Sequence, residues 1–205
     1  MLKKTSQALS TVSDTLAVLS GWAIIIFSMI VSLEVMLRKF AGVSIQGLDE
    51  YGGYVFGITA AFGFSYALFT RAHIRVDIVL RFVPRPGRAL LHLLSIVALT
   101  GFAFTMVHSG TGLVFSSWDL SARAVSPLQT PLIFPQGLWL LGLCLFATAS
   151  LLLTTRSIAA LLRNDLAEVE EIIGVPSVEE EAKEEIEAAR ARGMKSGIEL
   201  PEGGR

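Results

Sequence analysis

Four ionisable side chains stand within one stretch of seven residues, and side chains of these types can perform acid–base or anion-binding chemistry. They are Arg71, His73, Arg75 and Asp77. No nucleophile, metal-ligand set or phosphate-binding loop accompanies them in the sequence. Arg71 and Arg75 would share one helix face and repel each other, so lipid phosphates or acidic groups of another subunit would suit them best. We interpret the cluster as an interfacial segment rather than a catalytic centre.

A pair of opposite charges lies at the end of an apolar stretch. Glu34 and Arg38 are four residues apart, with the acid first, which places both on one face of a helix. A carboxylate at that depth in a membrane is costly unless it is paired. A proton or ion relay would need further acids at matching depth, and the later apolar stretches contain none. We therefore predict a structural pair that fixes the helix depth or meets a partner helix.

Two acids and a series of small residues mark the next apolar stretch. Asp49 and Glu50 begin it, where carboxylates suit the positive end of a helix dipole. Capping explains both, and they could also present negative charge to an extracytoplasmic partner. Gly53, Gly57 and Ala61 then recur every four residues, a spacing that lets two helix backbones approach closely. The motif predicts tight packing against a helix of this chain or of another.

Three histidines raise the alternative of a haem-binding anchor. His92 and His108 share one predicted helix, but sixteen residues separate them by about 24 Å, too far to hold one haem. A pair within this chain is possible only for His73 with His92, so packing roles for the histidines are favoured. Cys144 is the single cysteine, which excludes an intrachain disulfide and a cysteine-based metal site. We expect no cofactor, no metal and no catalytic residue.

The elements that carry these residues are set by four runs without Asp, Glu, Lys or Arg. The runs cover 15–33, 51–70, 89–118 and 124–155. A helix needs roughly 20 apolar residues to cross the bilayer core, so all four qualify. With 52% hydrophobic residues, the chain is expected to be an all-α membrane protein. We place its four transmembrane helices at about 17–39, 49–71, 87–116 and 132–160.

Lysine and arginine are unevenly divided between the two sides of this arrangement. Nine lie before the first helix, between the second and third, and just after the fourth. Three lie in the other connections, at Arg38, Lys39 and Arg123. Because cytoplasmic flanks retain positive charge, the pattern predicts that both termini are cytoplasmic.

Three regions outside the spans differ in character. Residues 1–16 could form a short amphipathic helix at the membrane surface or a frayed extension of the first span, and both alternatives stay open. The loop over 117–131 contains prolines and is expected to be irregular and short of regular hydrogen bonding. Residues 161–205 form an acidic cytoplasmic tail, with 12 acidic against 5 basic residues over 165–205. A capping pattern predicts a helix at 178–192, and we favour a solvated tail over a partner-docking helix.

The order of these features resembles the small membrane subunit of tripartite ATP-independent periplasmic (TRAP) transporters, the DctQ-like family. The resemblance covers about 17–160 and leaves the acidic tail outside it. The residues that carry it are Glu34 and Arg38 closing the first span, Asp49-Glu50 opening the second, the segment Arg71 to Asp77, and Pro131-Leu132-Ile133-Phe134-Pro135-Gln136-Gly137 opening the fourth.

The resemblance implies a non-catalytic scaffold in the inner membrane of a bacterium or archaeon. Its partners would be a large TRAP permease subunit with the substrate and cation sites, a periplasmic substrate-binding protein and membrane phospholipids, without nucleic acid. A cation gradient would drive uptake of an organic acid anion. By the same logic, Asp49, Glu50 and the 117–131 loop could help to dock the binding protein.

Two functions of other classes stay open beside the scaffold. A respiratory membrane anchor would bind haem or quinone. A self-sufficient four-helix channel or carrier would transport when reconstituted alone, whereas a scaffold would give no flux without the large subunit.

Overall fold

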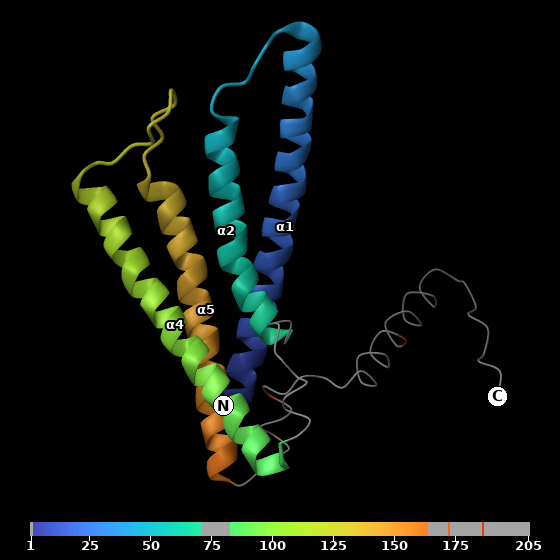
Figure 1. Cartoon of the computed structure of the whole chain (residues 1–205), viewed down its shortest axis with the longest axis vertical. Helices are drawn as coiled ribbons and strands as arrows, with labels where there is room; N and C mark the ends of the chain where they lie inside the picture. The colour runs from blue at the N-terminus through green and yellow to red at the C-terminus, as the bar shows by residue number, and fades with distance from the viewer. Residues whose placement is uncertain (1, 71–82, 164–171, 173–185, 187–205) are drawn as a thin grey trace, which may run out of the picture.

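The structure is a computed structural model that describes residues 2–70, 83–163, 172 and 186 (Figure 1). The segment Arg71 to Asp77 and most of the acidic tail, including the expected helix at 178–192, lie outside the described residues. Each helix contains a stretch long and apolar enough to cross a membrane, so the predicted all-α class with four spans is confirmed. The described helices are α1 (Leu2–Ala41), α2 (Leu48–Phe69), α4 (Arg85–Asp119) and α5 (Ile133–Leu162).

α1 is longer than a membrane span needs to be. It runs without a break over 40 residues, about 60 Å, whereas the hydrocarbon core is about 30 Å thick. Within the segment predicted at 1–16, residues 2–16 therefore continue the first span as one helix. No proline interrupts it, and Thr11 and Thr15 donate hydrogen bonds of 3.0 and 2.8 Å to carbonyls four residues earlier. Their hydroxyls are thus satisfied within the helix itself.

Prolines and one glycine determine where the other helices begin. Pro84 precedes α4 in an extended conformation, and Pro135 lies in the first turn of α5, where a missing amide hydrogen is tolerated. Gly47 precedes α2 with φ of +85°, a left-handed conformation that favours glycine. The bounds of these three helices differ from the predicted ones by at most three residues, the usual uncertainty at helix ends.

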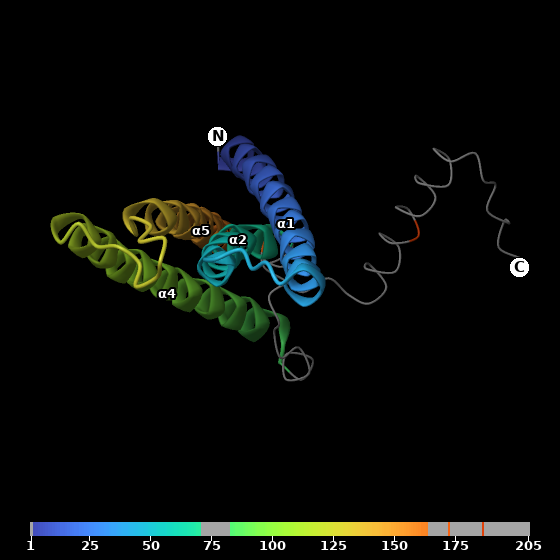
Figure 2. The same cartoon turned by 90° about the horizontal axis from the view of Figure 1, so that it is seen from above.

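The helices pack side by side in the order α1, α2, α5, α4 (Figures 1 and 2). α5, the last of the described helices in chain order, therefore lies between α2 and α4, and it runs in the same direction as α2. α5 contacts each of the other described helices, whereas α4 packs mainly on α5. The α1–α2 pair and the α4–α5 pair separate from each other toward one end of the bundle (Figure 1). The connection between α1 and α2 and the connection between α4 and α5 both lie at that end.

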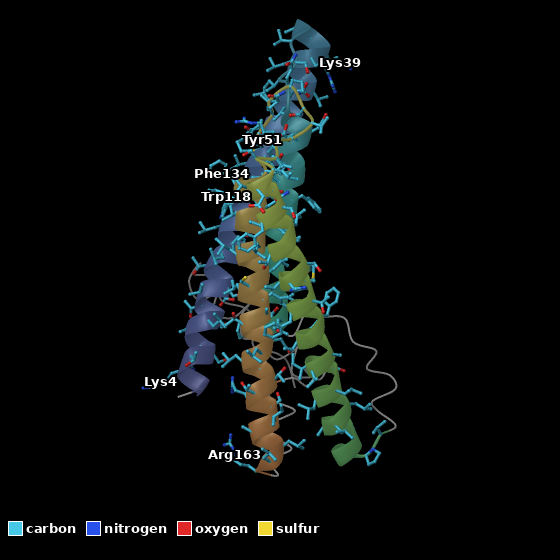
Figure 3. All side chains as sticks on the ribbon, turned by 90° about the vertical axis from the view of Figure 1, so that its left-hand side faces the viewer. Lys4, Lys39, Tyr51, Trp118, Phe134 and Arg163 are labelled. Atoms are coloured by element: carbon cyan, nitrogen blue, oxygen red, sulfur yellow. The ribbon has the colours of Figure 1, made fainter. Side chains whose placement is uncertain are left out.

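Charged and aromatic side chains lie at both ends of the bundle. Lys4 and Arg163 lie at one end, and Lys39 lies at the other (Figure 3). Tyr51, Trp118 and Phe134 lie toward the Lys39 end. Aromatic side chains near helix ends suit a membrane–water interface.

Small side chains hold the middle of the bundle together. Gly142 on α5 approaches α2 so closely that a Cβ atom there would lie 2.8 Å from the Ala61 Cβ and 3.0 Å from the Ala61 carbonyl carbon. Between α4 and α5, the buried hydroxyls of Thr100 and Thr154 form a hydrogen bond of 2.8 Å. Close backbone approach and interhelical hydroxyl bonds are the usual means of joining helices in lipid.

α1 buries only a narrow seam of its surface. Its buried residues are separated by multiples of seven, and they are Ser6, Ser13, Ser20 and Glu34. A seven-residue repeat is the seam of a left-handed helix pair, and serine keeps the two backbones close. Large apolar side chains cover the rest of α1, with Met29 69% exposed. That surface requires lipid or another protein.

Candidate partner-binding and polar sites

Glu34 is the buried acid of the first span, and its main partner is a residue that the sequence did not indicate. The Ser44 hydroxyl donates a hydrogen bond of 2.9 Å to Glu34 Oε1 from the connection between α1 and α2. Arg38 Nε lies 3.9 Å from the same oxygen, and its side chain is 61% exposed. The predicted pair therefore exists as a long contact, and Ser44 supplies the short one. Gly42, with φ of +67°, allows the chain to turn after α1.

Glu50 joins α2 to the connection between α4 and α5. The Tyr54 hydroxyl donates a hydrogen bond of 2.7 Å to Glu50 Oε1, and the Ser126 hydroxyl donates one to Oε2. Asp49 beside it is exposed. Both acids lie in the first turn of α2, where they suit the helix dipole, but Glu50 also holds a second element.

The connection over residues 120–132 corrects the expectation of an irregular loop. Arg123 and Pro131 form an antiparallel bridge, and Ala124 N donates to Thr130 O at 3.0 Å. Leu132 N donates to Ala122 O at the same distance. These bonds make a short hairpin, because the chain on each side of the turn pairs its backbone N–H and C=O groups with the other side. We call residues 120–132 the hairpin.

The hairpin packs against the beginning of α2 through an apolar side chain as well as through the hydrogen bond from Ser126 to Glu50. The Leu128 side chain fills the space where a Cβ atom at Gly47 would lie. Gly47 therefore serves both the left-handed turn and this contact. Val125 and Leu120 remain fully or largely exposed on the hairpin.

The small-residue motif on α2 is divided between two environments. Ala61 packs in the interior against Gly142, which the sequence did not single out. A Cβ atom at Gly53 would meet nothing within 4 Å, and one at Gly57 would meet only Trp139, at 4.0 Å. Gly53 and Gly57 instead line a cavity of 190 Å³ between α2, α4 and α5. Gln136 lines the same cavity, and its buried Oε1 has no hydrogen-bond partner among the described residues.

The remaining candidate residues either lie apart from one another or fall outside the described residues. Arg71, His73, Arg75 and Asp77 fall in the range 71–82, so the His73–His92 alternative does too. His92 is buried on α4, whereas His108 is exposed on the same helix. In the parts of the chain that the structure describes, no three His, Cys, Asp or Glu side chains lie close enough to hold a metal.

The polar contacts between elements are mostly pairwise and join one element to the next. Arg156 Nη1, for example, donates a hydrogen bond of 2.9 Å to Ser6 Oγ and connects the end of α5 to the beginning of α1. Neither Arg156 nor Ser6 was singled out in the sequence, because each has an ordinary residue type for its position and they are 150 residues apart. Contacts of this kind fix the packing of a bundle and leave its outer apolar faces for partners.

Comparison with known proteins agrees with this arrangement. Residues 27–160 match the model of a family described as tripartite ATP-independent periplasmic transporters, DctQ component. The matched range begins within α1 and ends near the end of α5, so it includes Glu34, Glu50, the hairpin and the Ala61–Gly142 crossing. No curated protein matches the chain.

Proposed function

Because the chain belongs to the DctQ component family of tripartite ATP-independent periplasmic transporters, and is therefore one of their small membrane subunits, we propose that it scaffolds the large permease subunit. The observation that carries the scaffold role is the use of its buried polar groups. The Ser44 hydroxyl is hydrogen-bonded to Glu34 at the end of α1, and the hydroxyls of Thr100 and Thr154 are hydrogen-bonded between α4 and α5. These buried polar groups therefore serve contacts within the bundle. A carrier would instead need ionisable groups that line a path.

The permease contact is best supplied by the cavity beside Gly53 and Gly57. Small residues let a partner helix approach closely, and the side chains of Gln136 and Trp139 line the same cavity from α5. Glu34 with the exposed Arg38, and the charged segment Arg71 to Asp77, are further proposed contacts with the permease or with lipid phosphates.

The other parts of the system follow from the same proposal. A periplasmic binding protein would deliver an organic acid anion, and a cation gradient would drive its uptake through the permease. Both termini would be cytoplasmic, with the 42–47 connection and the hairpin on the periplasmic side. The exposed Val125 lies on the hairpin and the exposed Asp49 lies in the first turn of α2, directly after the 42–47 connection, which suits docking of the binding protein.

Reconstitution tests the scaffold role directly. The chain alone in proteoliposomes should give no cation-driven uptake of organic acids, whereas the chain with its permease and binding protein should. Flux through the chain alone would replace the scaffold by a self-sufficient carrier. Haem absorption in the purified chain would support the respiratory anchor instead.

A matched pair of glycine variants tests the proposed contact. Leucine at position 53 would fill the cavity, and leucine at position 112 would enter open space on α4. Both variants should fold alone, since a Cβ atom at either glycine would meet none of the described residues within 4 Å. Only Gly53→Leu should reduce co-purification of the permease. Equal recovery with the two variants would show that the cavity is not the contact.

A further inference from the structure

A second cavity lies at the opposite end of the bundle from the hairpin, and its walls combine one cation with several hydroxyl and amide groups. It has a volume of 360 Å³, enough for roughly ten waters. Ser6, Gln7 and Ser10 line it from α1, and Arg156 lines it from α5. Phe69 and Leu153 supply an apolar wall. The DctQ match begins at residue 27 and so leaves the α1 side of this cavity outside the family.

Arg156 is the centre of this cavity. Its side chain is half-buried, and Nη1 donates to Ser6 Oγ at 2.9 Å. Across the described ranges, no carboxylate lies within ion-pair distance of its guanidinium. A partly desolvated cation without an acidic partner favours an anion from elsewhere. Because Ser6 accepts the arginine bond, its own hydroxyl hydrogen is left to donate to the same anion.

We propose that this cavity binds the phosphate of an anionic phospholipid. Guanidinium and hydroxyl donors converge on one space, and phosphate oxygens accept several such bonds at once. The apolar wall distinguishes a lipid from a soluble phosphate, since Phe69 and Leu153 would contact the glycerol and the first acyl carbons. Lys4 lies at the same end of the bundle and adds positive potential there (Figure 3). The proposal concerns this chain alone and does not depend on the scaffold role.

The competing occupant is a carboxylate of the chain itself. Asp165, Glu168, Glu170 and Glu171 follow α5 in the sequence. A variant with Asn and Gln at these four positions removes that competition without changing the cavity.

Native mass spectrometry of the full chain in detergent measures the binding. Dioleoyl phosphatidylglycerol should bind, whereas dioleoylglycerol, which has the same acyl chains and no phosphate, should not. Arg156→Gln should weaken phosphatidylglycerol binding about tenfold or more, as expected for a charge-assisted hydrogen bond. Ser6→Ala should weaken it about fivefold, and Arg156→Lys should restore part of the affinity. The control Arg163→Gln, an exposed cation at the same end, should change it by no more than about twofold.

Three results would overturn the proposal. The first is unchanged phosphatidylglycerol binding in folded Arg156→Gln or, if that variant does not fold, in Ser6→Ala. The second is displacement of the lipid by sn-glycerol 3-phosphate at equal concentration, which would assign the cavity to a soluble phosphate. The third is lipid binding that appears only after the four tail carboxylates are neutralised, which would assign Arg156 to the chain's own acids.

Discussion

Replacing Gly142 with alanine would test the crossing of α2 and α5 that holds the middle of the bundle. The new Cβ atom would lie 2.8 Å from the Ala61 Cβ, 3.0 Å from the Ala61 carbonyl carbon and 3.1 Å from the Phe62 amide nitrogen. Two of these three neighbours are backbone atoms, so no side chain can rotate away. Since carbon atoms pack at about 3.5–4.0 Å, the helices must separate by roughly 1 Å along the crossing.

The cost of that separation can be isolated with a second alanine variant. Overpacking of this kind costs about 1–3 kcal/mol, and alanine returns about 1 kcal/mol through its higher helix propensity. Gly53→Ala gains the same propensity, but its Cβ meets nothing within 4 Å. The difference between the two variants should therefore be about 1–3 kcal/mol, with Gly142→Ala less stable.

The assay is reversible unfolding of the isolated chain in dodecylmaltoside micelles titrated with sodium dodecyl sulfate, followed by helicity. The free energy of unfolding should be lower for Gly142→Ala than for Gly53→Ala. Equal free energies would refute the close crossing, because the two variants differ only in what surrounds the added methyl group.

Three further perturbations probe other contacts of the fold. Ser126→Ala removes a hydrogen bond to a carboxylate, so tryptic cleavage after Arg123 in the hairpin should accelerate about tenfold; the control Ser116→Ala, whose hydroxyl bonds only within α4, should leave the rate unchanged. Thr154→Val removes the bond to α4 and should lower the free energy of unfolding by about 1 kcal/mol in the same detergent titration; no change would mean that the bond is not formed. Glu34→Ala and Arg75→Ala should each reduce the abundance or co-purification of the permease complex several-fold. Normal assembly with abolished cation coupling would instead point to a direct role in transport.

The spans could be predicted from the sequence because the property that places a helix in lipid is local. Runs without charge are visible residue by residue, and a bilayer tests each run by its own length and polarity. The expected segments therefore lie within the observed helices apart from a few terminal residues. The sequence does not determine where α1 begins. A surface helix at 1–16 and an extension of the first span would have the same hydrophobic pattern, so the pattern cannot distinguish them.

The contacts between elements could be predicted only where both partners are close in sequence. Glu34 with Arg38 is such a pair, whereas its shorter contact comes from Ser44 across a turn. The small-residue motif around Ala61 predicted that another helix packs closely on α2. It did not indicate that Gly142, 81 residues away, is the contact on that helix. Gly142 is a single small residue and belongs to no repeating pattern that would mark it in the sequence. Which small residue packs on Ala61 depends on which helices become neighbours in the fold.

The hairpin was missed for a related reason. Its prolines correctly excluded a helix, but the backbone bonds between Ala124 and Thr130 require two segments to fold back on each other. The docking of Leu128 on Gly47 then depends on α2, which is far away in sequence. Proline content alone could not distinguish this seated hairpin from an unstructured loop.

The position of α5 between α2 and α4 has a consequence for biogenesis. A ribosome delivers α1, α2 and α4 to the membrane before it delivers α5, yet α4 packs mainly on α5. During synthesis α4 would therefore wait in lipid without its principal neighbour, and the bundle would close only when the fourth span inserts. A nascent chain that stops before residue 133 would expose the small-residue face of α2 and leave Thr100 without its contact to α5, features by which a membrane protease could distinguish unfinished subunits from finished ones.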